Sequence, residues 1–173
     1  FHASGGNLVM EGKDPETLFK RTPNLILNTF ELCQAHNLIP NYQIKQLIKK
    51  HSHLLSQVLL NKKIIKPFIF NTLKNTNSEK HLRLMHEVGI LGLILPEYGR
   101  AHCKVSYDFY HRYTADEHSL RMVRFLEELE NKPTEFKELA IIYERLHNKT
   151  LLKLSTFIQP AEENNDSDAP NGS

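Results

Sequence analysis

His118 is the residue of this sequence whose setting most clearly suggests chemistry. It lies in the stretch "YHRYTADEHSLRMVRFLEEL", residues 110–129, where a polar cluster precedes an amphipathic run. Backbone N–H dipoles in the first turn of a helix disfavour a proton on a nearby imidazole. Because a metal ion binds the neutral imidazole, one interpretation of His118 is a metal ligand. The other is a polar neighbour of the helix cap.

The other histidines form no recognisable ligand pattern. His51 and His53 stand two residues apart, and His81 and His86 stand five apart, so neither pair shares a helical face. We therefore expect these four side chains on the surface. The sequence also lacks a His-Glu-x-x-His pair, a Gly-rich phosphate loop, a Gly-x-Ser-x-Gly elbow and an EF-hand loop.

A strongly signalled helix positions His118. Thr114 and Glu117 have the spacing of a capping box, in which the Thr side chain accepts from the Glu117 backbone and Glu117 reaches back to the Thr114 N–H. The apolar residues that follow recur at helical spacing: Leu120, Val123, Leu126 and Leu129. The pattern predicts an amphipathic helix over residues 114–130.

Most of the remaining chain also has helical patterns, so we predict a mainly α protein, a helical bundle with a short N-terminal β-hairpin. The hairpin turn falls at Ser4–Gly6. Proline after a capping residue marks helix starts at Asp14 and Thr22, and Gly89 marks a helix end. Pro67 indicates a helix start or a kink. We interpret residues 90–100 as a short helical turn followed by a buried loop.

Composition is that of a soluble globular protein, with 40% hydrophobic and 24% charged residues among 173. The net charge of +2 is too small to imply a nucleic-acid partner. The most basic run, residues 49–66, lacks arginines and interleaved aromatics, which favours a solvated helix face over a polyanion site. Two distant cysteines, no signal peptide and no apolar run of about 20 residues predict a cytoplasmic location and no membrane contact.

In its motifs at Arg83–Met85, Gly89–Gly92, Pro96–Arg100 and Tyr113–His118, the middle of the chain resembles the bacterial bifunctional PII uridylyltransferase/uridylyl-removing enzymes. The family pattern has an Arg-x-Met stretch, a Gly-Val-Leu-Gly, a Pro-Glu-Phe-Gly-Arg and a final Tyr-Thr-Val-Asp-Glu-His. The likeness extends weakly upstream to an Asp-Pro-x-x-Phe element and covers nearly all of residues 1–158. The matching positions are Arg83–Met85, Gly89–Gly92, Pro96–Arg100, Asp108, His111 and Tyr113–His118.

The resemblance implies an HD domain, which in this family binds a divalent metal, Mg or Mn, and hydrolyses uridylyl-tyrosine on the PII signalling protein. The family ligands are a His, a later adjacent His-Asp pair and a final Asp, and the first His matches His118. Asp108 and His111 belong to the motif without an assigned role. We favour hydrogen bonds that hold the loop before the helix over direct contact with metal or phosphate.

The sequence departs from the family where the remaining ligands should follow. No adjacent His-Asp pair exists in the chain, and the segment after "LLKLSTFIQ" is a polar tail. The Gly-Ser and Asp-x-Asp motif of the nucleotidyltransferase is also missing. We therefore expect no catalytic residue and no tightly bound metal. The chain begins with Phe1 rather than Met, so we also expect a piece of a longer protein.

Three hypotheses follow for the chain. The first is an inactive fragment of the bifunctional enzyme, with a helical connector after a nucleotidyltransferase domain (residues 1–100), the start of an incomplete HD-type domain (101–159) and a disordered tail (160–173). The second is a non-catalytic helical interaction module, and the third a piece of another HD phosphohydrolase. The motifs at Pro96–Arg100 and Tyr113–His118 disfavour the third. The missing helices should leave an apolar face uncovered on helix 114–130, which would promote self-association.

Overall fold

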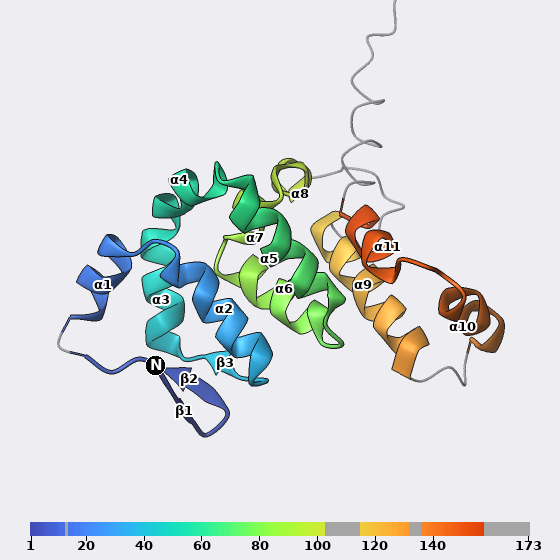
Figure 1. Ribbon diagram of the computed structural model, residues 1–173, viewed down its shortest axis with the longest axis horizontal. Coiled ribbons are helices and arrows are strands. Elements are labelled where there is room, and N and C mark those ends of the chain that lie inside the picture. Colours follow the sequence, from blue (N-terminus) through green and yellow to red (C-terminus); the bar gives the residue numbers. More distant parts are fainter. Residues whose placement is uncertain (13, 103–114, 132–135, 158–173) are drawn as a thin grey trace, which may run out of the picture. The chain divides into compact units, whose positions relative to one another are not determined.

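The computed structural model describes residues 1–12, 14–102, 115–131 and 136–157 (Figure 1). It divides into two compact units, Phe1–Ile94 and Leu95–Ser173. The prediction of a mainly α fold is confirmed in both. Every helix in the described residues is too short or too polar to cross a bilayer. The expected capping residue Thr114 and the tail after residue 159 lie outside the described residues.

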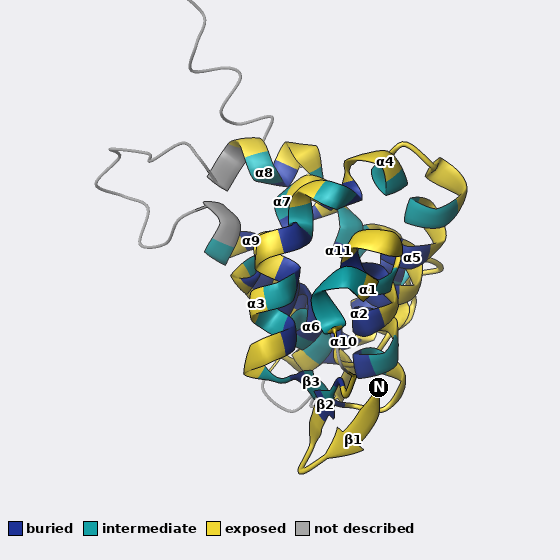
Figure 2. Cartoon of the chain, turned by 90° about the vertical axis from the view of Figure 1, so that its left-hand side faces the viewer, coloured by how far each residue is buried: buried dark blue, intermediate teal, exposed yellow. Residues whose placement is uncertain are grey.

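The first unit opens with the predicted hairpin. Strands β1 (His2–Ser4) and β2 (Asn7–Val9) pair antiparallel through a two-residue turn, and Figure 2 shows β1 in the colour of exposed residues. Gly5 and Gly6 have φ values of +53° and +77°, the left-handed conformation that a tight hairpin turn requires. A third strand, β3 (Ile39–Pro40), pairs parallel with β2 and was not predicted, because two residues give no alternating pattern.

The remaining elements of the first unit are helical. Asp14 caps the first of them as predicted, since its Oδ1 accepts from the Thr17 backbone N–H at 3.0 Å. The second begins at Leu25, after a turn whose Thr22 carbonyl accepts from the Leu25 N–H at 2.9 Å. Its start is therefore two residues later than the Thr22–Pro23 signal indicated. The elements are α1 (Pro15–Arg21), α2 (Leu25–Ala35), α3 (Tyr42–His51), η1 (Ser52–Leu54), α4 (Leu55–Leu59), α5 (Lys62–Lys74), α6 (Ser78–Glu87) and α7 (Leu91–Ile94).

Two histidines belong to the interior of the first unit. The unit's core draws on apolar residues of most of its helices: Phe19, Ile26, Phe30, Ile44, Ile48, Leu55, Leu73, Leu82, Met85 and Leu91. His51 is 3% exposed and His81 is 1% exposed, so the prediction that both lie on the surface is wrong. Each follows a buried helical position by three residues, Ile48 and Ser78, and so continues the buried face of its helix.

The second unit is built around one long helix. Its elements are α8 (Pro96–His102), α9 (Ala115–Asn131), α10 (Lys137–Glu144) and α11 (Lys149–Ser155). Helix α9 is the predicted amphipathic helix, and α8, α10 and α11 all pack against it. The short helical turn expected within residues 90–100 is present as α7, but residues 96–100, where we expected a buried loop, belong to helix α8 instead. Pro96 occupies its first position, where the missing N–H is not needed, and Tyr98 is buried.

The expected uncovered face on helix 114–130 is also wrong. The apolar stripe of α9 is buried, with Leu120 and Val123 at 0% exposure and Leu126 and Leu129 at 7%. Leu126 and Leu129 belong to a small core with Ala140 and Tyr143 of α10. The short helices that follow α9 therefore cover the stripe that we had assigned to missing helices.

A glycine ends α6 and turns the chain into α7. Gly89 has φ +77°, its N–H bonds the His86 carbonyl at 2.9 Å, and the Ile90 N–H bonds the Met85 carbonyl at 3.0 Å. This pair of bonds is a Schellman motif, which satisfies the last carbonyls of the helix. The predicted helix end at Gly89 is confirmed.

Replacing Gly89 tests whether a glycine is required to end α6. Gly89→Ala should lower the free energy of unfolding by about 1 kcal/mol, because an L-residue with a Cβ is strained at this φ. Gly89→Asn should cost less, since Asn tolerates the left-handed region. Urea titrations followed by circular dichroism measure both, and equal losses for the two variants would contradict the explanation.

Candidate functional site

His118 lies in the first turn of α9, and its side chain is exposed. The residue before it, Glu117, pairs with Arg121 one turn along the helix, with Oε1 2.9 Å from Nε. Both members of this pair stand within three residues of His118 along the helix. His118 is therefore open to a ligand from solvent, and its ring is not packed in an apolar interior.

The next residue, Ser119, anchors a different side of the same turn. Ser119 is fully buried, and its Oγ donates to the Thr156 carbonyl at 2.8 Å, just past the C-terminal end of α11. Beside this bond the ring of Phe157 meets Tyr98 of α8 edge to face, with centroids 5.5 Å apart. The end of α11 is therefore held beside the first turn of α9, where His118 stands.

The described residues do not complete a metal site around His118. Among them, no group of three or more His, Cys, Asp or Glu side chains is arranged to hold an ion. One imidazole supplies one nitrogen ligand, and a catalytic metal needs about three protein ligands. Asp108 and His111 lie outside the described residues, so their expected hydrogen-bonding role stays a prediction.

A buried polar cluster lies on the other side of α9, and the sequence did not suggest it. Lys153 of α11 is 3% exposed, and its Nζ lies 3.6 Å from Oε1 of Glu127. Burial, with the carboxylates of Glu130 and Glu127 nearby, raises the pKa of Tyr143 to about 12. The phenol therefore stays protonated at neutral pH and cannot act as a base there. A Lys inside the apolar run "LLKLSTF" was the signal that could have revealed this cluster.

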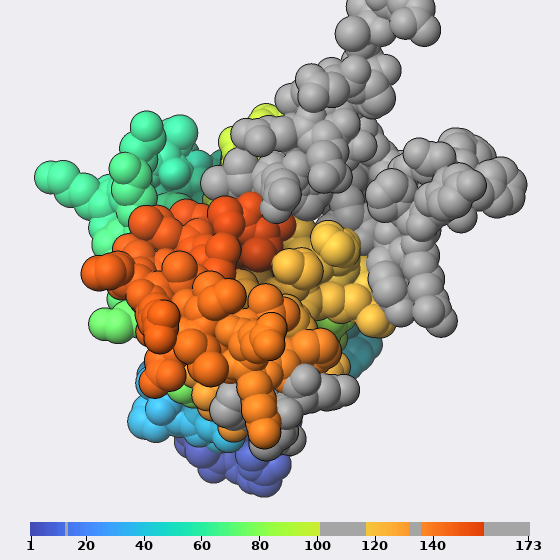
Figure 3. Space-filling view, turned by 90° about the vertical axis from the view of Figure 1, so that its right-hand side faces the viewer, coloured from blue at the N-terminus to red at the C-terminus, as the bar shows by residue number. Residues whose placement is uncertain are grey.

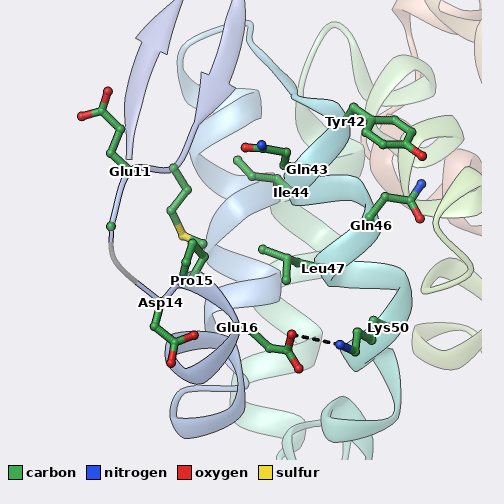
Figure 4. Close-up of a pocket in the computed structure, with 12 residues that line it drawn as sticks. Glu11, Asp14, Pro15, Glu16, Tyr42, Gln43, Ile44, Gln46, Leu47 and Lys50 are labelled. Atoms are coloured by element: carbon green, nitrogen blue, oxygen red, sulfur yellow. Dashed lines mark hydrogen bonds and ion pairs between the residues drawn. The ribbon is translucent and has the colours of Figure 1, made fainter.

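A groove in the first unit is a second candidate site. It encloses about 720 Å³ between the chain that leads into α1 and the side of α3, and Figure 4 shows the Glu16 carboxylate directed at Lys50. Lys50 and Lys20 each approach a Glu16 carboxylate oxygen at 2.9 Å and lower its pKa to about 2. A carboxylate so strongly paired is a poor proton acceptor, so Glu16 is unsuited to act as a general base at neutral pH.

The two buried histidines are held in the neutral form. Burial lowers the pKa of His51, although Glu16 opposes the shift with its Oε1 at 3.5 Å from Nε2. Burial, helped by the Lys80 ammonium, lowers the pKa of His81 to about 4. Neither His51 Nε2 nor His81 Nδ1 has a hydrogen-bond partner among the described residues. Both are core residues of α3 and α6, remote in the sequence from His118.

Known proteins match both units of this chain. The family model described as "Uridylyltransferase GlnD third domain" matches residues 1–94, the whole of the first unit. The chain therefore belongs to the family of bifunctional uridylyltransferase/uridylyl-removing enzymes. No solved structure matches it. The family match disfavours the hypothesis that the chain comes from an unrelated HD phosphohydrolase.

Individual relatives extend the match into the second unit. The bifunctional uridylyltransferase/uridylyl-removing enzyme of Phenylobacterium zucineum is 30% identical over 152 residues, which is 84% of this chain and 16% of the relative. That of Nitrosococcus oceani is 30% identical over 145 residues, covering 80% of this chain and 16% of the relative. That of Pseudomonas savastanoi is 32% identical over 124 residues, covering 70% and 14%. The chain thus spans about one sixth of the length of these relatives.

Acidification should destabilise the first unit through His81. An unfolded His81 has an ordinary pKa of 6.5 and the folded one about 4, so the unfolded state binds the proton more tightly. Stability is therefore lost as the pH falls from 6.5 towards 4, by up to about 1.4 kcal/mol per pH unit. His81→Leu should flatten this slope in urea titrations, whereas the same change at the exposed His53 should not. Parallel pH profiles for all three proteins would refute the assignment.

Removing the Ser119 hydroxyl tests the anchor of α11. Ser119→Ala should lower the free energy of unfolding by about 1–3 kcal/mol, because the buried Thr156 carbonyl loses this donor. Ser155→Ala, which deletes an exposed hydroxyl bonded to the Leu152 carbonyl, is the matched control and should change little. Urea titration measures both variants. Similar small losses in the two would show that the bond is dispensable.

Proposed function

We propose that this chain is an inactive portion of a uridylyltransferase/uridylyl-removing enzyme, carrying the helical connector and the opening helices of its HD-type hydrolase domain. On this proposal, residues 1–100 are the connector that follows the nucleotidyltransferase domain, and residues 101–159 begin the HD domain. The family membership and the motif at Tyr113–His118 support it. The full enzyme would add and remove UMP on a tyrosine of the PII protein in the cytoplasm.

The observation that carries the proposal is the contact between α11 and the first turn of α9. In the family that this chain resembles, the His-Asp pair follows the apolar segment that corresponds to α11. The Ser119–Thr156 bond holds the end of that segment beside the turn that bears the exposed His118. Ligands from two different helices would thus converge at one place, as a metal centre between helices requires.

The residues present do not fit a complete centre for Mg or Mn. Among the described residues, no group of three or more candidate ligands includes His118, and the sequence holds no His-Asp pair. We therefore derive no hydrolytic step for this chain. His118 would contribute one imidazole ligand, while α8 and α11 hold the turn that presents it.

A non-catalytic helical module is the second candidate. It is favoured by the way the short helices α10 and α11 already bury the apolar stripe of α9, which gives the second unit a core of its own. The same helices would then form a surface for interaction with another molecule, and they would coordinate no metal. A test of whether His118 can still support hydrolysis separates the two candidates.

A chimera provides that test. Residues 1–157 of this chain would replace the matching segment of the Nitrosococcus oceani enzyme, whose own downstream sequence follows. We expect the chimera to remove UMP from uridylylated PII with Mn²⁺ present, and His118→Ala to abolish removal while leaving UMP transfer intact. The isolated chain should show neither activity.

The matched control is His147→Ala, because His147 is another exposed histidine of the second unit. It should remove UMP as fast as the unchanged chimera. Equal removal by the His118→Ala chimera would exclude His118 as a ligand. A chimera that folds and transfers UMP, yet removes none, would favour the non-catalytic module.

A further inference from the structure

Helix α10 carries an apolar stripe that the second unit leaves uncovered. The α10 stripe consists of Leu139, Ile142 and Leu146, which are 47%, 60% and 40% exposed and stand three and four residues apart. Residues at this spacing share one helix face, and the last of them extends the face into the C-terminal turn. In Figure 3 the segment from residue 136 onward, in orange, lies uncovered towards the viewer.

The stripe is distinct from the face by which α10 holds on to α9. Ala140 and Tyr143 point into the core of the second unit at 7% and 3% exposure. Phe136, just before the helix, stacks edge to face on Phe125 of α9 with centroids 5.3 Å apart. One side of α10 therefore packs into the core of the second unit, and the α10 stripe lies outside that core.

Two opposite charges border the stripe on the side away from the buried residues of α10. Glu138 and Arg145 are both exposed and stand seven residues apart, which is two helical turns, so they share a side of α10. Each is three or four residues from Ile142. In the part of the chain that the structure describes, neither makes an ion pair. The negative charge is at the N-terminal end of the stripe and the positive charge at its C-terminal end.

We propose that two copies of this chain associate through their α10 stripes, antiparallel about a two-fold axis near Ile142. This arrangement places Glu138 of each copy opposite Arg145 of the other, so the charge pairs form twice. A parallel arrangement would bring like charges to the same level, and the helix dipoles would also oppose it. The inference does not depend on the proposed function of His118.

The positions of Glu138 and Arg145 indicate that a second copy of the chain covers the stripe. A purely apolar stripe would accept any apolar surface, whereas this one is complementary to itself after a two-fold rotation. The apolar side chains remove their area from water and supply the attraction. The two flanking pairs set the orientation and make the association sensitive to salt.

Sedimentation equilibrium of the 173-residue chain tests the proposal. We expect a reversible monomer–dimer equilibrium that Ile142→Glu shifts by about a hundredfold or more towards monomer. The control Leu60→Glu adds the same charge at an 82% exposed leucine of the first unit and should leave the equilibrium unchanged. All of these positions are exposed, and circular dichroism verifies that each variant is folded.

A charge-reversal cycle tests the orientation. Glu138→Arg and Arg145→Glu, each alone, should weaken the dimer by about tenfold, because each places like charges opposite one another twice. The double variant restores opposite charges and should dimerise as the original chain does. A chain that stays monomeric at all concentrations would overturn the proposal. A double variant no tighter than the single variants would overturn the antiparallel arrangement.

Discussion

The second unit depends on the burial of one face of α9. Three short helices make this possible, because α8, α10 and α11 each bring apolar side chains to the stripe from Leu120 to Leu129. The three short helices pack on the long α9, and the specific bond from Ser119 to the Thr156 carbonyl adds a defined register to this non-directional attraction.

The same constraint explains why His118 faces solvent. Adjacent helical residues point about a quarter turn or more apart, so burying Ser119 and Leu120 turns His118 outward. Ser119 therefore attaches one side of the turn to α11, and His118 is exposed to solvent on another side. This division suits a ligand that must meet partners from elsewhere. The neighbouring Glu117 is paired with Arg121 one turn along the helix.

Several polar groups of the two units have environments that the packing or an ion pair determines. His81 is neutral in the core of the first unit, and Tyr143 and Lys153 lie buried in the second. Glu16 is held charged by two lysines at the rim of its groove. His81, Tyr143 and Lys153 are buried by the packing of their own units, and Glu16 is paired with its two lysines. The pKa shifts of His81, Tyr143 and Glu16 thus have structural causes, namely burial in the first two and ion pairing in the third.

Local signals in the sequence determined the hairpin turn at Gly5–Gly6, the cap at Asp14, the helix end at Gly89 and the amphipathic course of α9, because each depends on neighbouring residues alone. The resemblance carried by Tyr113–His118 also indicated the family before any fold was known. Tertiary structure alone decided that β3 joins the sheet, that His51 and His81 are buried, and that α10 covers α9 while exposing its own stripe. These outcomes depend on which surfaces meet across the chain, and residue spacing within one helix does not specify its partner.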